Sequence, residues 1–199
     1  MPAETSNKTV LVTGFGPFGS HNVNASWVAV QELDKQWNMK GVDLAIQEIP
    51  VEYATVFKMV PELWEEVKPC LVIHVGVSGI ASKLTLEQQA HNDGYNKKDV
   101  KGTCPEKNCC VNGANNCIVS NIDMHKVCDE INDLGIDVKS TVSEDPGRYL
   151  CDFSYFLSLN IDKSRSAFIH VPPLDQPYSG KQLAQGLQAA ITAMLKQVS

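Results

Sequence analysis

The chain has 199 residues, 43% of them hydrophobic, and a formal net charge of −6 at pH 7. This length and apolar content suffice for one compact domain with a single core. The acidic balance argues against nucleic acid or an anionic membrane as a partner, because both attract a basic face. We therefore expect a small or peptidic ligand.

No apolar run approaches the roughly 20 residues that span a bilayer. Residues 1–6 lack the basic start and the apolar middle of a secretion signal. The seven cysteines are an odd number in an ordinary globular composition, which favours reduced thiols over a disulfide framework. We expect a cytoplasmic protein with free thiols.

Short apolar runs alternate with helix-length stretches along the chain. Strands are predicted at residues 9–13, 42–46, 71–75, 138–142 and 166–171. Helices are predicted at residues 25–35, 54–68, 124–134, 147–157 and 180–197. Asn24 can cap the first helix, and Ser179 and Gln182 have capping-box spacing before the last. This alternation predicts one α/β domain over residues 1–199, an α/β/α sandwich with a largely parallel, mixed sheet, as in phosphorylase and hydrolase folds.

One segment interrupts the alternation. Residues 96–117 are rich in Lys, Asn, Gly and Cys, which is typical of a long exposed loop. Its cysteines suggest a zinc site, but their spacing lacks the two C-x-x-C pairs typical of such a site, and no histidine accompanies them. We predict a Cys-rich surface loop and no metal.

A glycine-rich motif, Gly14-Phe15-Gly16-Pro17-Phe18-Gly19, follows the first predicted strand. It meets the G-x-G-x-x-G spacing, yet it lacks the Gly-Lys-Ser/Thr ending of a P-loop and a clearly placed acid for a ribose. Nucleotide binding is therefore disfavoured. A substrate pocket is the alternative, with Phe15 and Phe18 as flat apolar walls. The simpler interpretation, two core aromatics beside a turn, stays open.

A cysteine and a histidine supply candidate chemistry. Cys151 follows Asp145-Pro146-Gly147, a helix entry at which free amide groups and the helix dipole favour a thiolate. His170 ends a strand before two prolines, and its imidazole can take a thiol proton and return it to a leaving amine. Taken alone, a lone cysteine is usually an apolar core residue, and a strand-end histidine is usually structural. His74, in the middle of an apolar strand, is predicted to be a satisfied core histidine.

Four motifs together resemble the pyroglutamyl-peptidase I family, also called pyrrolidone-carboxylate peptidases, in its animal form. The motifs lie at residues 13–19, 84–92, 147–153 and 168–173, and the likeness runs from about Val10 to the last helix. The resemblance implies a triad of Glu87, Cys151 and His170, in which Glu87 orients the imidazole. It also implies that Phe15 and Phe18 line a lactam pocket.

The activity that this resemblance implies is hydrolysis of the amide bond after an N-terminal pyroglutamyl residue of a peptide. The reaction would run through a thioester and need no cofactor and no metal. Two other functions stay open, a peptide-binding module that has lost turnover and a phosphorylase-like enzyme on a similar fold. A phosphorylase would need an arginine-lined anion site, and the only arginines are Arg148 and Arg165. The sequence does not specify the oligomeric state.

Overall fold

A six-stranded sheet forms the centre of the computed structural model, which describes residues 8–19 and 22–198. In spatial order its strands are β2 Val42–Ile49, β1 Lys8–Phe15, β3 Leu71–Val77, β8 Ser166–Val171, β4 Leu84–Glu87 and β7 Ser140–Ser143. The first four strands of this order are parallel. β4 runs antiparallel to β8, and β7 is parallel to β4. The prediction of a largely parallel, mixed sheet is confirmed.

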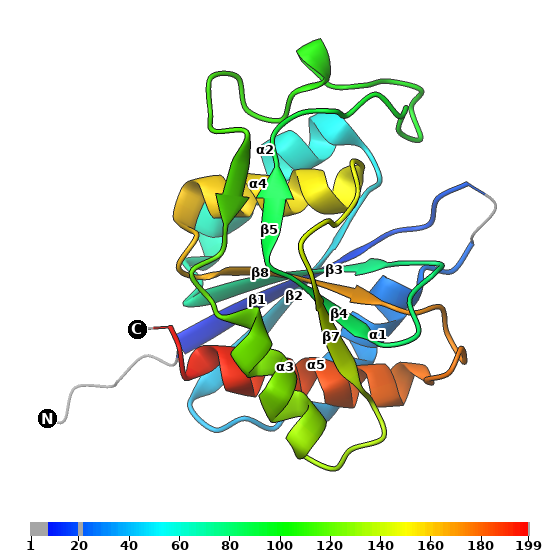
Figure 1. Ribbon diagram of the computed structural model, residues 1–199, viewed down its shortest axis with the longest axis vertical. Helices are drawn as coiled ribbons and strands as arrows, with labels where there is room; N and C mark the ends of the chain where they lie inside the picture. Colours follow the sequence, from blue (N-terminus) through cyan, green and yellow to red (C-terminus); the bar gives the residue numbers. More distant parts are fainter. Residues whose placement is uncertain (1–7, 20–21, 199) are drawn as a thin grey trace, which may run out of the picture.

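Helices cover both faces of the sheet, as predicted (Figure 1). On one face lie α2 Tyr53–Val67 and α4 Leu150–Asp162, and on the other lie α1 Ala25–Gln36, α3 Met124–Asp133 and α5 Gly180–Leu195. Successive side chains of each central strand point to opposite faces of the sheet and pack against the helices on that face. In β1, Val10 and Val12 pack on the α1 and α5 side, whereas Leu11 packs on the α2 and α4 side.

Local capping explains where two of the helices begin. The Asn24 side chain accepts the backbone N–H of Ser26 at 3.0 Å and caps α1. Ser179 and Gln182 form the expected capping box at the start of α5. Both predictions are confirmed.

The helix that carries Cys151 begins three residues later than predicted, at Leu150. Gly147 has a φ of +84°, and its N–H is held by the Asp145 carboxylate at 3.1 Å. A left-handed backbone cannot belong to a helix, so this segment forms a turn before α4. Cys151 is consequently the second residue of the helix.

Three short strands were not predicted. One is β4, and the others are β5 Gln89–His91 and β6 Cys117–Val119, which pair with each other in an antiparallel ribbon beside α4 (Figure 1). The segment between them is irregular apart from a short 3₁₀ turn at Glu106–Asn108.

The predicted surface loop at residues 96–117 is only partly exposed. Cys110 is 5% exposed and Asp99 7%. The Asp99 carboxylate accepts the N–H of Tyr53 at the start of α2 and those of Lys101 and Thr103 in the loop. This carboxylate therefore fastens the loop to the α2 and α4 layer.

Within residues 8–19 and 22–198, no helix is both long and apolar enough to cross a bilayer. Residues 1–6, on which the expectation of no secretion signal depends, lie outside the described residues.

Candidate active site

The candidate acid and base come from neighbouring antiparallel strands. In the pairing of β4 with β8, Thr85 is opposite His170 and Glu87 is opposite Phe168. Glu87 is therefore the diagonal neighbour of His170 on the same face of the sheet. Its Oε1 lies 2.8 Å from His170 Nδ1. Glu87 follows the third predicted strand along the chain and ends β4, a strand that was not predicted, inside the sheet.

The candidate thiol approaches the same imidazole from the helix layer. In the pairing of β3 with β8, Gly76 lies beside His170. A Cβ atom on Gly76 would stand only 2.6 Å from the Cys151 sulfur. Cys151 and His170 line the same cleft, and the Cys151 side chain is near enough to the His170 ring to raise its pKa. Since Nδ1 faces Glu87, Nε2 is the nitrogen that remains for the sulfur. Thiol, imidazole and carboxylate thus form one continuous array.

The protonation of His170 reflects these neighbours. Burial alone would lower the pKa of His170, but the charge and hydrogen bond of Cys151 and those of Glu87 together raise it to about 10. His170 is 7% exposed and Glu87 2%, so water screens the interaction weakly. Cys151 also lies in the first turn of α4, where the helix dipole favours negative charge. This environment favours the imidazolium form of His170.

An apolar pocket adjoins the sulfur. It has a volume of about 70 Å³. Its lining consists of Phe15, Phe18, Asn24, Val51, Val77, Tyr149, Leu150 and Cys151. Phe15 is buried at the end of β1, whereas Phe18 is partly exposed. An open cleft of about 720 Å³ shares Phe18 and Cys151 with this pocket and also contains Glu87 and His170.

The glycines beside this pocket have packing roles. A Cβ on Gly14 would lie 2.9 Å from the backbone of Trp27 in α1, so glycine lets β1 and α1 approach closely. Gly19 has a φ of +56° and allows a left-handed turn. Two of the three glycines in the G-x-G-x-x-G spacing are accounted for by these needs.

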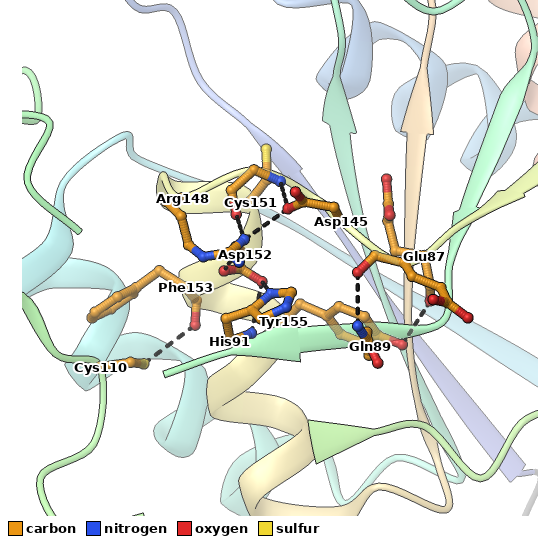
Figure 2. A network of polar contacts seen from close by, with 12 residues as sticks. Glu87, Gln89, His91, Cys110, Asp145, Arg148, Cys151, Asp152, Phe153 and Tyr155 are labelled. Carbon is orange, nitrogen blue, oxygen red and sulfur yellow. Dashed lines mark hydrogen bonds and ion pairs between the residues drawn. The ribbon is translucent and has the colours of Figure 1, made fainter. Parts of the chain in front are cut away.

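A network of buried polar groups lies behind the thiol (Figure 2). Asp152 is fully buried, and its carboxylate accepts the backbone N–H of His91 at 3.0 Å. It also lies 3.0 Å from the Tyr95 hydroxyl and 3.6 Å from Arg148. Burial raises the pKa of Asp152 to about 7, although these three partners oppose the shift. Arg148 makes a closer contact of 2.7 Å with Asp145.

His74 belongs to the core, as predicted. Its ring nitrogens lie 2.6 Å from the Thr13 hydroxyl and 2.7 Å from the Ser158 hydroxyl. Burial lowers the pKa of His74 to about 3, so the ring is neutral at pH 7. It does not contribute to the candidate site.

The cysteines of the loop are free thiols. None of the seven cysteines of the chain forms a disulfide. In the part of the chain that the structure describes, no three His, Cys, Asp or Glu side chains converge as metal ligands would.

Sequence reasoning missed Gly76, Asp152 and Tyr155. A glycine between two valines of a buried strand is a usable signal, because it often marks a close approach of another group. Asp152 and Tyr155 act through backbone groups of distant segments, and no local pattern reports such contacts.

A thiol at a helix start, an imidazole and a buried carboxylate on an α/β sandwich define the site of a cysteine hydrolase. Comparison with known proteins narrows this class. The chain belongs to the pyroglutamyl peptidase family, whose sequence pattern matches residues 8–197.

Named relatives and solved structures point to the same family. The chain is 54% identical over 192 residues to pyroglutamyl-peptidase 1 of Mus musculus and to that of Homo sapiens, covering 96% of this chain and 92% of each relative. It is 30% identical over 200 residues to pyrrolidone-carboxylate peptidase of Clavibacter michiganensis, covering 94% of this chain and 92% of the relative. The structure of a mutant pyrrolidone carboxyl peptidase from Pyrococcus furiosus matches with a TM-score of 0.85 at 26% identity, covering 94% of this chain and 98% of that one.

Proposed function

We propose that this chain is a cysteine exopeptidase that hydrolyses the amide bond after an N-terminal pyroglutamyl residue of a peptide. In this proposal Cys151 is the nucleophile, His170 the general acid and base, and Glu87 the group that orients His170. The observation that carries the proposal is the 2.8 Å contact of His170 Nδ1 with Glu87, in a cleft that Cys151 also lines.

The first half of the reaction is acyl transfer to sulfur. The Cys151 thiolate attacks the carbonyl carbon between pyroglutamate and the next residue. The His170 imidazolium gives its proton to the leaving amine nitrogen, and the C–N bond breaks to leave a thioester. We assign the free N–H groups in the first turn of α4 as donors to the transient oxyanion.

The second half is hydrolysis of the thioester. His170, now neutral, takes a proton from water, and the hydroxide attacks the thioester carbonyl. The C–S bond breaks, pyroglutamic acid leaves, and the thiolate with its imidazolium is restored. Glu87 stabilises the imidazolium in both halves. The cycle uses no redox or cofactor step.

Selectivity follows from the pocket beside the sulfur. We assign Phe15 and Phe18 as the flat walls that hold the neutral lactam ring. A charged amino terminus would lose its water there without a compensating carboxylate, at a cost of several kcal/mol. Peptides with a free amino terminus are therefore rejected.

The arginines argue against phosphorolysis. Arg148 is engaged by Asp145, and Arg165 contacts Asp162 and the carbonyl of Pro69, at the end of the sheet away from His170. Neither is available to bind a phosphate at the sulfur. A binding module without turnover would have no need of the Glu87 and His170 pair.

The proposal extends to the setting of the enzyme. It treats the chain as one peptidase domain whose substrates are pyroglutamyl peptides. A cytoplasmic location fits, because Cys151 must stay a free thiol and the cytoplasm keeps thiols reduced.

Matched reporter amides of pyroglutamate, glutamine and proline test the proposal. Only the pyroglutamyl amide should be cleaved, and iodoacetamide should stop its cleavage. Cys151→Ala should lower kcat more than about 1000-fold, whereas Cys117→Ala, at an exposed thiol, should leave it unchanged. Full activity of Cys151→Ala would show that the nucleophile is assigned wrongly. Binding of the peptide without release of pyroglutamate would favour the binding module, and dependence on phosphate the phosphorylase.

A further inference from the structure

The nucleophile and the acid reach His170 from elements that share no backbone pairing. Pairing of β4 with β8 fixes Glu87 relative to His170. Cys151 lies on α4, outside the sheet, so no strand register sets its position. Productive attack needs the reacting groups aligned to within a fraction of an ångström. Direct contacts between α4 and the segment of Glu87 can supply that alignment.

Tyr155 makes the first such contact. It is fully buried on α4, and its hydroxyl donates to the backbone carbonyl of Glu87 at 2.9 Å. Its ring packs on Phe168, with centroids 5.9 Å apart, and Phe168 in turn packs on the His170 ring at 4.7 Å. One side chain of the helix therefore touches the backbone of the acid and, through Phe168, the ring of the base.

Asp152 makes the second contact, one helical turn earlier and next to Cys151. Its Oδ1 accepts the backbone N–H of His91, four residues after the acid. Its Oδ2 lies 3.0 Å from the Tyr95 hydroxyl, which also contacts the carbonyl of His91. Figure 2 shows Asp152, His91, Tyr155 and Glu87 along one side of α4. The two contacts thus bracket residues 87–91.

The Tyr95 hydroxyl has one hydrogen and two acceptors within reach. It can donate fully to only one of them, and when it donates to the His91 carbonyl a protonated Asp152 carboxyl group can donate to the Tyr95 oxygen in turn. The raised pKa of Asp152 agrees with such a protonated form near neutral pH. Asparagine reproduces this pattern, because its oxygen can accept from His91 and its NH₂ group can donate to Tyr95.

We propose that Tyr155 and Asp152 are positioning residues, a clamp that joins residues 87–91 to α4 and so holds the Glu87 and His170 pair within reach of Cys151. The clamp touches no substrate. It acts on the alignment of the three reacting groups and leaves the lactam pocket untouched. The inference rests on the proposed function, because turnover of a pyroglutamyl amide is its main readout.

Tyr155→Phe tests the first arm of the clamp, since it removes only the hydroxyl. We expect kcat to fall roughly 10- to 100-fold while KM stays within about twofold, because alignment is lost and the pocket is kept. The matched control is Tyr178→Phe. Its buried hydroxyl likewise holds one backbone group, the N–H of Lys139, but on the opposite side of the sheet. Both variants should lose similar thermal stability, and only Tyr155→Phe should lose kcat.

Asp152→Asn and Asp152→Ala test the second arm. Asparagine should keep kcat within about threefold of the wild type, whereas alanine, which leaves the His91 N–H without an acceptor, should lower it roughly tenfold or more. Equal activity of these two variants would overturn the role of Asp152. An unchanged kcat in folded Tyr155→Phe would overturn the role of Tyr155. If the Tyr155 variant fails to fold, the Asp152 variants test the clamp. If the Asp152 variants fail to fold, the Tyr155 variant tests it.

A second readout separates this inference from the proposed function. The rate at which iodoacetamide alkylates Cys151, followed by mass spectrometry of its peptide, reports the support of the thiolate by His170 without any substrate. It should fall in Tyr155→Phe and stay unchanged in Tyr178→Phe. If the wild-type protein releases no pyroglutamate, the proposed function is wrong. The alkylation rates then still test the clamp, because they need no substrate. Equal rates in both tyrosine variants would refute it.

Discussion

Gly76 shows how one missing side chain shapes the candidate site. It lies on β3 beside His170, and the space that its Cβ would occupy is taken by the Cys151 sulfur and the Phe168 ring. Real Cβ atoms are essentially never found as close as the 2.6 Å and 2.8 Å that these two groups would impose. Any larger residue must therefore displace the sulfur, the ring or both.

Gly76→Ala should lower kcat strongly, by roughly 100-fold, because a displacement of about 1 Å can cost that much. Gly79→Ala is the matched control. It lies three residues further on, and no atom stands within 4 Å of the position that its Cβ would take. Steady-state kinetics and a thermal unfolding curve of both variants check the prediction. Normal turnover by Gly76→Ala would mean that the sulfur does not need its present position.

Glu87→Gln should move the alkaline limb of the activity profile. The imidazolium that we propose as the acid for the leaving amine persists until the pH rises through the pKa of His170, about 10 in this site. Glu87 is one of the groups that raise this pKa. Replacing its carboxylate with a neutral amide removes a stabilising charge, so the pKa of His170 falls.

The profile of kcat/KM against pH measures this shift. In Glu87→Gln the alkaline decline should begin at a lower pH than in the wild type. The matched control is Asp145→Asn, because Asp145 also lines the cleft but pairs with Arg148. Coincident alkaline limbs in the wild type and Glu87→Gln would contradict the assigned role of Glu87.

At the scale of elements, the long strands and helices could be predicted from the sequence and the shortest strands could not. β1, β3 and β8 are apolar runs, and α1 and α5 carry visible caps. β5 and β6 have three residues each, too few for a periodic pattern, and they exist because they pair with each other. Their formation depends on tertiary contacts that no local window contains.

The reversed direction of β4 was also missed, although the chain contains a signal for it. Only six residues separate the end of β3 at Val77 from the start of β4 at Leu84. A crossover between parallel strands needs about a dozen residues or more. The short link therefore favours an antiparallel return, which brings Glu87 alongside β8.

The candidate site divides in the same way. Cys151, His170, Glu87 and the two phenylalanines could be found from motifs, because each lies in a distinctive run of residues. Asp152 and Tyr155 could not, since their importance lies in what packs against them, and Gly76 offered only the general signal of a glycine within a buried strand. The structure brings the motif residues together and adds the contacts that hold them.

In the molecule as a whole, His74 links the central sheet to the helices that cover one of its faces. Its ring joins β1 through Thr13 to α4 through Ser158, and the Ser158 hydroxyl also accepts the Trp64 indole N–H of α2. Because its pKa of about 3 lies below the ordinary 6.5, the unfolded chain binds a proton between these values that the folded chain refuses. Stability contributed by neutral His74 is thus present above pH 6.5 and lost as the pH falls toward 3.

His74→Gln should weaken the dependence of unfolding free energy on pH. One such proton contributes a slope of about 1.4 kcal/mol per pH unit. Urea unfolding from pH 4 to 7 should show a flatter slope for His74→Gln than for the wild type. His125→Gln is the control, because His125 is exposed on α3 and should leave the slope unchanged. Parallel slopes for the wild type and His74→Gln would show that another group takes up the proton.

The diagonal pairing of Glu87 with His170 has a consequence for how the protein can fail. If β4 slipped by one residue along β8, Glu87 would turn to the opposite side of the sheet, and Leu84 and Leu86 would leave the interior that they now fill. Removing two leucines from the core layer that they fill costs several kcal/mol, a large part of the margin that keeps a domain folded. A chain with this shifted register would therefore be both inactive and less stable. The packing that stabilises the fold also fixes the register that places Glu87 beside His170.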